Sequence, residues 1–206
     1  MDFPAHIFKA YDIRGVYPSE LNEELVYKIG RAYAEFLKKE VLKDVLTVVV
    51  GRDMRQSSPS LSEAVIRGVL AQGVNVVDIG LVSTPTFYFG VSYYGYDGGL
   101  QISASHNPSE YNGVKLVRSQ ARPVSGEDGI NEIRDLVAAG IFPEVARPGS
   151  VTTRTGILEE QINYALGTVA VAKIKPLHIV IDAANSMGAP LMEELFKHLP
   201  CRLTKL

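Results

Sequence analysis

The sequence has 206 residues, of which 46% are hydrophobic, and its 21 basic and 23 acidic residues give a net charge of −2. This length allows one large domain or one domain and part of a second, and the charge balance excludes a strongly basic nucleic-acid binder and an acidic disordered chain. Its single cysteine cannot form an internal disulfide, and no apolar run approaches the roughly 20 residues of a membrane helix. We therefore expect a cytoplasmic globular protein that binds neither nucleic acid nor membrane.

Predicted helices and strands alternate along the first part of the chain. Apolar residues recur at steps of three and four over 21–39 and predict an amphipathic helix, with Asn22 as a candidate N-cap. The apolar run 45–50 predicts a buried strand, and Ser58 and Pro59 open a second helix, which ends at Gly73. Residues 74–79 predict another strand. This order is typical of a sheet covered by helices.

An aromatic-rich segment, 84–94, predicts a short helix whose rings pack in the core. Strands are predicted over 100–103 and 114–117. Because Asn112-Gly113 is typical of a tight turn, we expect the second of these strands to return antiparallel to the first. A helix over 127–139 ends at Gly140. The predicted fold is a three-layer α/β/α domain with a mixed, mostly parallel four-stranded sheet.

Residues 141–156 have no helical periodicity and contain Pro143, Pro148 and Gly149, so we interpret them as a linker. Beyond them the pattern predicts a helix over 157–172, a strand over 177–182, a helix over 190–198 and a strand that begins at Arg202. We therefore predict one domain over 1–150, and the linker and incomplete start of a second, similar α/β domain over 151–206.

Two polar segments follow predicted strands, where ligands collect in open α/β sheets. In the first segment, Arg52 or Arg55 can form bidentate pairs with a phosphate or a carboxylate, although an Arg52–Asp53 pair in an ordinary loop is the simpler interpretation. In the second, Ser105 stands beside an imidazole and an amide and is a candidate nucleophile. An ordinary Ser/Asn/Pro turn is the simpler interpretation there too.

Other common kinds of site are missing from the sequence. The four histidines lack the spacing of a zinc site, there is no carboxylate-rich loop for magnesium, and neither a Walker loop nor Gly-x-Gly-x-x-Gly is present. The N-terminal segment 8–15 gathers Lys9, Asp12 and Arg14 around Tyr11 without helical or strand periodicity. It is either part of a site or an arm held in place by an Arg14–Asp12 pair.

Three segments together resemble the α-D-phosphohexomutase family, nearest its bacterial phosphomannomutase/phosphoglucomutase branch. They are Phe-Lys-Ala-Tyr-Asp-Ile-Arg-Gly at 8–15, Gly-Arg-Asp at 51–53, and Ser-Ala-Ser-His-Asn-Pro at 103–108 with Asn-Gly-Val-Lys at 112–115. The match runs in order from residue 5 to about residue 200. Gly-Thr in place of Ala10-Tyr11 would resemble the phosphoglucosamine mutase branch. The Ala-Tyr pair therefore argues against that branch.

The resemblance implies that Ser105 is a phosphoserine. In this family it passes its phosphoryl group to a hexose 1- or 6-phosphate through a bisphosphate intermediate. The resemblance implies that Lys115 stabilises charge or moves the hydroxyl proton and that His106 orients the phosphoryl group. It assigns the binding of the hexose phosphate to Lys9, Tyr11, Arg14, Arg52 and Asn107.

The resemblance also implies Mg²⁺, held by a phosphoryl oxygen on Ser105 and by ligands outside this chain, with glucose or mannose 1,6-bisphosphate as activator. Family members have four domains and are more than twice as long. We therefore expect an N-terminal fragment that is inactive without the missing C-terminal domains of its parent protein. The alternatives are a stand-alone, non-catalytic module of the same fold that binds a sugar phosphate or a partner, and a phosphoglucosamine mutase.

Overall fold

The computed structural model describes residues 3–206, which divide into two compact units on either side of the Arg154–Thr155 bond. The first unit contains one sheet, with the strands β1 (Ile13–Val16), β2 (Thr47–Arg52), β3 (Asn75–Leu81), β4 (Gly98–Ile102), β5 (Tyr111–Arg118) and β6 (Val151–Thr153). Their order across the sheet is β1-β5-β4-β2-β3-β6. The β2–β3, β2–β4 and β3–β6 pairs are parallel, whereas β5 runs antiparallel to both β4 and β1.

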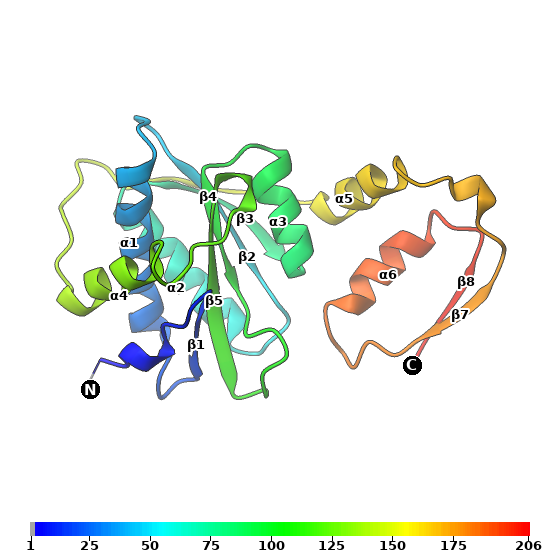
Figure 1. Ribbon diagram of the computed structural model, residues 1–206, viewed down its shortest axis with the longest axis horizontal. Helices are drawn as coiled ribbons and strands as arrows, with labels where there is room; N and C mark the ends of the chain where they lie inside the picture. The colour runs from blue at the N-terminus through cyan, green and yellow to red at the C-terminus, as the bar shows by residue number, and fades with distance from the viewer. Residues whose placement is uncertain (1–2) are drawn as a thin grey trace. The chain divides into compact units, whose positions relative to one another are not determined.

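Helices cover both faces of this sheet. The α-helices of the first unit are α1 (Glu23–Glu40), α2 (Ser58–Ala71), α3 (Thr84–Tyr93) and α4 (Ile130–Ala139), and two 3-10 turns occupy Ala5–Ile7 and Ser119–Ala121. In Figure 1, α1, α2 and α4 lie on one side of the sheet and α3 lies on the other. The predicted class, a three-layer α/β/α fold with a mixed sheet, is therefore confirmed.

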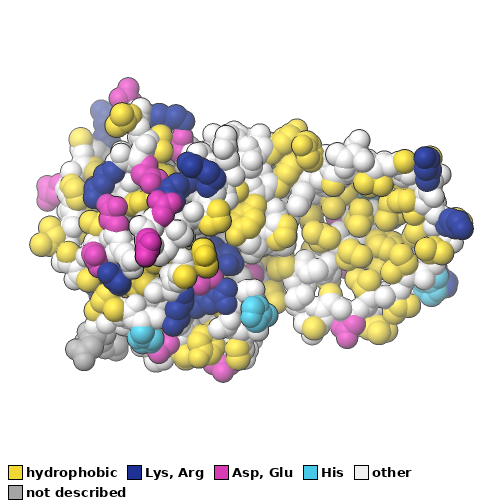
Figure 2. Space-filling model, in the orientation of Figure 1, with side chains coloured by type: hydrophobic (Ala, Val, Ile, Leu, Met, Phe, Trp, Pro, Cys, Tyr) yellow, Lys and Arg dark blue, Asp and Glu magenta, His cyan; other side chains and the backbone are white. Residues whose placement is uncertain are grey.

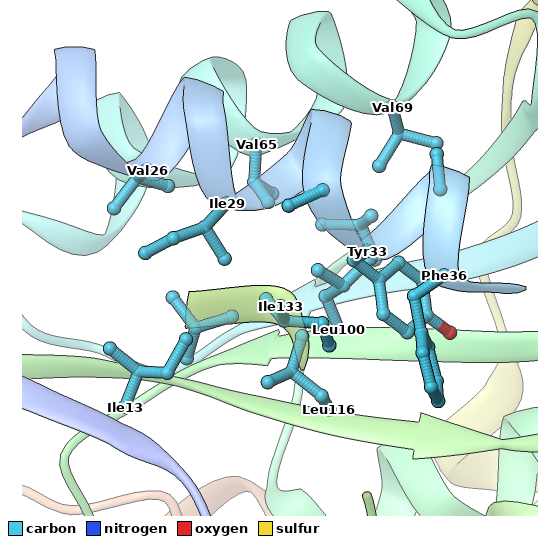
Figure 3. Close-up of a cluster of buried hydrophobic side chains, with 14 of the residues drawn as sticks. Ile13, Val26, Ile29, Tyr33, Phe36, Val65, Val69, Leu100, Leu116 and Ile133 are labelled. Atoms are coloured by element: carbon cyan, nitrogen blue, oxygen red, sulfur yellow. The ribbon is translucent and has the colours of Figure 1, made fainter. Parts of the chain in front are cut away.

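The main core lies between the sheet and the layer of α1, α2 and α4. Figure 3 shows Val26, Ile29 and Tyr33 of α1 above Leu100 and Leu116 of the sheet, all of them buried. Burial raises the pKa of the Tyr33 phenol, whose hydroxyl donates a 2.7 Å hydrogen bond to a backbone carbonyl of β5. A buried polar group needs such a partner, since it has lost its bonds to water.

The helix ends follow from local chemistry. Asn22 caps α1 as predicted, because its side chain accepts a 3.0 Å hydrogen bond from the Leu25 N–H. Gly140 ends α4 with a φ of 64°, a left-handed conformation that glycine adopts without strain. Close packing of α1 on α2 depends on Gly68, where a Cβ would lie 2.1 Å from the Tyr27 carbonyl. Ser58 is the first residue of α2, as its position before Pro59 predicts.

The sheet has six strands where the sequence predicts four, and both additional strands lie at its edges. β1 comes from the N-terminal segment, and β6 lies within the predicted linker 141–156 and pairs with β3. All three residues of β6 are exposed, so they carry no alternation of apolar and polar side chains. The linker interpretation is therefore wrong for Val151–Thr153.

The predicted tight turn at Asn112-Gly113 is also wrong, because both residues lie within β5. Gly113 stands opposite Arg14 of β1. A Cβ there would lie 2.5 Å from the Ile13 carbonyl oxygen and 2.9 Å from that of Ser103. The glycine therefore serves the close approach of neighbouring backbones, and the chain reverses earlier, between β4 and β5.

The aromatic helix α3 packs in the core less completely than predicted. Phe87 is fully buried on the face of the sheet opposite α1, but Tyr93 is 55% exposed. Its ring stacks on Phe89 at a centroid distance of 4.7 Å. The rings therefore form a partly exposed cluster around a single buried anchor.

The second unit contains α5 (Ile157–Leu166), a 3-10 turn (Val171–Lys173), β7 (His178–Ile181), α6 (Gly188–Phe196) and β8 (Arg202–Lys205). β7 and β8 pair in parallel. The helix predicted over 157–172 ends earlier, next to Gly167. Among residues 155–206 the buried apolar side chains are Ile157 and Ile162, and Figure 2 shows hydrophobic side chains over much of the visible face of this unit. The division into domains at 1–150 and 151–206 stays a prediction.

Within residues 3–206, no helix combines the length and the apolar character that crossing a bilayer requires.

Candidate functional site

Segments far apart in the sequence meet beside β1 and β5 of the first unit. A cavity of about 630 Å³ opens there. It is lined by His6, Lys9, Ala10, Tyr11, Asp12, Arg14, Glu20, Asn107, Tyr111 and Lys115. The N-terminal segment, the loop between β4 and β5, and β5 itself all contribute to this lining. Figure 2 shows Lys and Arg side chains gathered over the same part of the first unit.

Asp12 is the electrostatic centre of this cavity. The carboxylate is buried, accepts a 2.8 Å hydrogen bond from Arg14 Nε, and lies 3.2 Å from Lys115 Nζ. The Arg14–Asp12 pair expected for a fixed arm is therefore present. Arg14 also donates from Nη1 to Asn107 Oδ1 at 3.0 Å, so it joins the N-terminal segment to the loop that carries Ser105. Sequence reasoning noticed Asp12 but gave it no role in the site.

Two of the predicted binding residues, Lys9 and Tyr11, lie at the rim of the cavity. Both are exposed, and Tyr11 keeps 70% of its surface open to solvent. On the same rim His6 Nε2 and Glu20 Oε1 are 2.9 Å apart. The hydrogen bond from the Val16 N–H and the bond with His6 lower the pKa of the Glu20 carboxyl. The rim thus offers exposed groups that can contact a ligand.

The serine loop, residues 103–110, connects β4 to β5. Ser105 and His106 are exposed on it, and Ser105 Oγ lies 3.2 Å from His106 Nδ1. Ser105 has a φ of 56°, in the left-handed region that residues other than glycine rarely occupy. Its N–H donates to Ser103 Oγ at 3.1 Å. Strained backbone of this kind clusters at functional sites, because the surrounding structure must hold it in place.

The arginine that reaches the serine loop is Arg55 and not Arg52. Arg52 ends β2, half-buried, and is absent from the lining of the cavity. The Arg55 guanidinium donates to four backbone carbonyls between Ser105 and Tyr111. Asp53 lies 3.4 Å from Arg55 Nε, so it pairs with Arg55 where the sequence suggested Arg52. No residue pattern distinguishes the two arginines before the path of the loop is known.

A buried polar network links β5 to the start of α2. Ser58 Oγ donates to Asp53 Oδ1 at 2.6 Å, and Asn112 Nδ2 donates to Ser58 Oγ at 3.0 Å. Ser58 is fully buried, and Ser57 takes the N-cap position of α2. The hydroxyl of Ser58 therefore fixes Asp53 instead of capping the helix.

The charges of the cavity suit an anionic ligand. Its lining contains three cations, Lys9, Arg14 and Lys115, and two carboxylates, those of Asp12 and Glu20, so positive charge is in excess. Guanidinium and ammonium groups are the usual partners of phosphate oxygens. Within residues 3–206 there is no group of three or more His, Cys, Asp or Glu side chains that could hold a metal ion.

Comparison with known protein families and structures gives consistent matches. Residues 5–144 match the family described as phosphoglucomutase/phosphomannomutase, alpha/beta/alpha domain I. A phosphomannomutase of Vibrio cholerae is 43% identical over 190 residues, which cover 92% of this chain and 41% of that protein. A protein of Xanthomonas campestris named phosphohexose mutases is 42% identical over 209 residues, which cover 100% of this chain and 44% of the relative.

A crystal structure of a phosphoglucomutase/phosphomannomutase family protein from Burkholderia thailandensis superimposes with a TM-score of 0.86 at 33% identity. The match covers 98% of this chain and 44% of that one. The chain thus spans about two-fifths of the length of the curated relatives it matches.

Proposed function

The chain belongs to the phosphoglucomutase/phosphomannomutase family, and we propose that it is the phosphoserine-bearing N-terminal part of an enzyme that interconverts hexose 1-phosphates and hexose 6-phosphates. Ser105 carries the phosphoryl group, and a hexose bisphosphate is the intermediate. The observation that supports this best is the Arg14–Asn107 bond of 3.0 Å. It joins the N-terminal segment to the serine loop beside a cavity lined by cations.

In the second half of the proposed cycle the Ser105 oxygen forms a bond to the phosphorus of one phosphate of a hexose bisphosphate. The bond from that phosphorus to the sugar oxygen breaks, the serine hydroxyl gives up its proton, and the sugar oxygen gains one. His106 Nδ1, 3.2 Å from Ser105 Oγ, can orient the phosphoryl group or take the hydroxyl proton. In the first half of the cycle the reverse step moves the phosphoryl group from Ser105 to the free hydroxyl of a hexose monophosphate, and the bond from the phosphorus to the Ser105 oxygen breaks. The hexose bisphosphate that forms then reorients, so that the second half removes its other phosphate and phosphorylates Ser105 again.

Charge and position account for most of the catalysis in phosphoryl transfers, because the protein has little covalent chemistry to do beyond supplying the Ser105 oxygen. A phosphoserine carries nearly two negative charges and meets a second phosphate in the site. Lys115 and Arg14 lie on the cavity wall, where their charges can offset this repulsion, and Lys9 and Tyr11 can close over a bound sugar. Asn107 holds Arg14 in place. Arg52, predicted to bind phosphate, lies outside the cavity lining, so we give it no role in this step.

The resemblance to the family implies Mg²⁺, which would offset phosphate charge when bound. The described residues offer no cluster of metal-binding side chains, and the buried Asp12 carboxylate is already paired with Arg14 and Lys115. These residues by themselves do not fit the ion, and no step above depends on it. Any role of Ser105 as a ligand would come from its phosphoryl oxygen.

The remaining parts of the proposal concern the whole protein. Hexose phosphates are the proposed substrates, and glucose or mannose 1,6-bisphosphate is the proposed phosphoryl donor that charges Ser105. The cavity is formed by the first unit alone and is wide open, so we propose that the chain needs the C-terminal domains of its parent protein for turnover. Mutase turnover by the chain alone would contradict this part, and a cytoplasmic location stays a prediction.

Intact-mass spectrometry tests the proposal. The chain is incubated with glucose 1,6-bisphosphate and Mg²⁺, and we expect it to gain one phosphoryl group. Ser105→Ala should gain none, whereas Ser109→Ala, a matched change at another exposed serine of the loop, should behave as wild type. Equal labelling of the Ser105→Ala variant would contradict the assignment.

A further inference from the structure

The side chain of Arg55 binds the backbone of the serine loop at four points. Its Nη1 donates to the carbonyl oxygens of Pro108 at 2.7 Å and Tyr111 at 2.8 Å. Its Nη2 donates to those of Asn107 at 2.6 Å and Ser105 at 3.2 Å. One planar guanidinium thus spans the loop from the proposed phosphoserine to the start of β5. The guanidinium thus ties the serine loop, which otherwise depends on short local turns, to the segment that follows β2.

Asp53 in turn holds the Arg55 side chain in place. Its side chain is 9% exposed and lies against that of Asp53, which is 7% exposed. Asp53 Oδ1 accepts hydrogen bonds from the Arg55 N–H at 3.0 Å and from Ser58 Oγ at 2.6 Å. The Asp53 carboxylate offsets the charge of the guanidinium, so the group has little net charge to offer a phosphate. The Arg55 guanidinium therefore contributes mainly through the geometry of its hydrogen bonds.

The loop needs such support because Ser105 has a φ of 56°. That conformation is strained for an L-amino acid and persists only where surrounding contacts impose it. Close to Ser105 the local hydrogen bonds run from the Asn107 N–H to the Ala104 carbonyl at 3.1 Å and from the Ser105 N–H to Ser103 Oγ at 3.1 Å. Further along the loop, the Tyr17 N–H donates to the Glu110 carbonyl at 2.8 Å and Arg14 donates to Asn107 Oδ1 at 3.0 Å. Arg55 adds four bonds to the backbone between Ser105 and Tyr111, more than any of these groups supplies.

We propose that Arg55 is a positioning residue for Ser105: it holds the serine loop in the conformation that presents the Ser105 oxygen to a phosphate ester. The inference rests on the proposed function of Ser105 as the phosphoryl carrier. Arg55 is absent from the lining of the cavity. It acts through the loop backbone, and its planar fork matters more than its charge, since a lysine ammonium cannot span four carbonyls in this arrangement.

Arg55→Lys and Arg55→Met test the proposal, with Arg118→Met as the matched control. Arg118 is similarly buried, with a side chain 7% exposed, and bonds the carboxylates of Glu40 and Asp128 and two backbone carbonyls away from the serine loop. Two readouts are compared, both corrected for the folded fraction: amide hydrogen exchange over 104–112 in the unphosphorylated chain, and phosphoryl uptake from glucose 1,6-bisphosphate.

For both Arg55 variants we expect exchange in the loop to be at least about tenfold faster and the maximal rate of uptake to be at least about tenfold slower. The half-saturating bisphosphate concentration should stay unchanged, because Arg55 does not contact the ligand. Arg118→Met should lower the unfolding midpoint while leaving loop exchange and uptake as in wild type.

An Arg55→Lys variant that matches wild type in exchange and uptake would overturn the proposal, as would an Arg55→Met variant with an unchanged loop. A raised half-saturating concentration at an unchanged maximal rate would overturn it too, since that result belongs to a ligand contact. If the wild-type chain accepts no phosphate, the proposed function fails, and the exchange measurement still decides whether Arg55 fixes the loop. Arg55→Lys, which keeps the charge and the aliphatic stem, supplies both readouts if Arg55→Met does not fold.

Discussion

Replacing Gly113 with alanine tests how far the site depends on the pairing of β1 with β5. The new Cβ would lie 2.5 Å from the Ile13 carbonyl oxygen and 2.9 Å from that of Ser103. Cβ atoms essentially never approach another heavy atom within 3.0 Å, so the backbones must separate by about 0.5 Å. Both atoms belong to the main chain, and no side-chain rotation can relieve the overlap.

Overpacking of this kind costs about 1–3 kcal/mol. Because the neighbours are backbone on two different segments, we expect a loss near the upper end, about 3 kcal/mol, which is about a hundredfold in the folding equilibrium. At a typical denaturant dependence of about 2 kcal/mol per molar urea, the unfolding midpoint should fall by about 1.5 M. Urea titration followed by circular dichroism measures this shift.

The same change should reach the site, since Arg14 stands opposite Gly113 and bonds Asn107 at 3.0 Å. Gly126→Ala is the control, because its Cβ would meet Ala10 at an ordinary 3.6 Å and the chain should stay within about 0.5 kcal/mol of wild type. A Gly113→Ala chain as stable as wild type, or a Gly126→Ala chain equally destabilised, would refute the reasoning.

Three further predictions concern the core, the response to pH and the cavity. Tyr33→Phe should lower the free energy of unfolding by about 1–2 kcal/mol, because it leaves a buried carbonyl without its 2.7 Å hydrogen bond; an unchanged urea midpoint would contradict this. The hydrogen bond from Ser60 Oγ lowers the pKa of Glu23 below 4.5, so the folded state gains stability above that pH and loses it as the pH falls through the lowered pKa. The difference in melting temperature between wild type and Glu23→Gln should therefore be largest near neutral pH and shrink as the pH falls through the lowered pKa, and a difference that grows in acid would be contrary to it. Arg14→Met should raise the dissociation constant for glucose 6-phosphate about tenfold by calorimetry, while Arg134→Met on the exposed face of α4 should leave it unchanged; equal effects would count against a site at the cavity.

The regular parts of the fold are predictable from the sequence because burial imposes a period on it. The helix predicted over 21–39 and the strand predicted over 45–50 fall within two residues of α1 and β2, since each places apolar side chains on a buried face. β1 and β6 were not predicted because they are short edge strands with little apolar pattern. Pairing with a neighbouring strand stabilises such strands, and the local sequence does not show that pairing. The turn predicted at Asn112-Gly113 was wrong for a related reason. Glycine occurs both in tight turns and where neighbouring backbones approach closely, and the sequence does not distinguish the two.

The candidate site was only partly predictable from the sequence. Of the residues to which the resemblance pointed, Lys9, Tyr11, Arg14, Asn107 and Lys115 line the same cavity, whereas Arg52, Ser105 and His106 are absent from its lining. The roles assigned to these residues stay predictions.

The choice between two arginines was not predictable from the sequence. Arg52 and Arg55 follow the same strand, and only the path of the serine loop selects the second as its partner. Every residue has a main-chain carbonyl, so a guanidinium that binds such carbonyls does not require particular side chains in the loop. No sequence motif therefore marks the contact.

Mapping the phosphorylated residue is the most direct test of Ser105 as the phosphoryl carrier. The chain is incubated with glucose 1,6-bisphosphate and Mg²⁺, digested, and its phosphopeptides are sequenced by tandem mass spectrometry. We predict a single modification at Ser105, with none at Ser103, which is buried, or at Ser109, which is exposed on the same loop. Phosphate on Ser103 or Ser109 with Ser105 unmodified, or a folded chain that takes up none, would contradict the account.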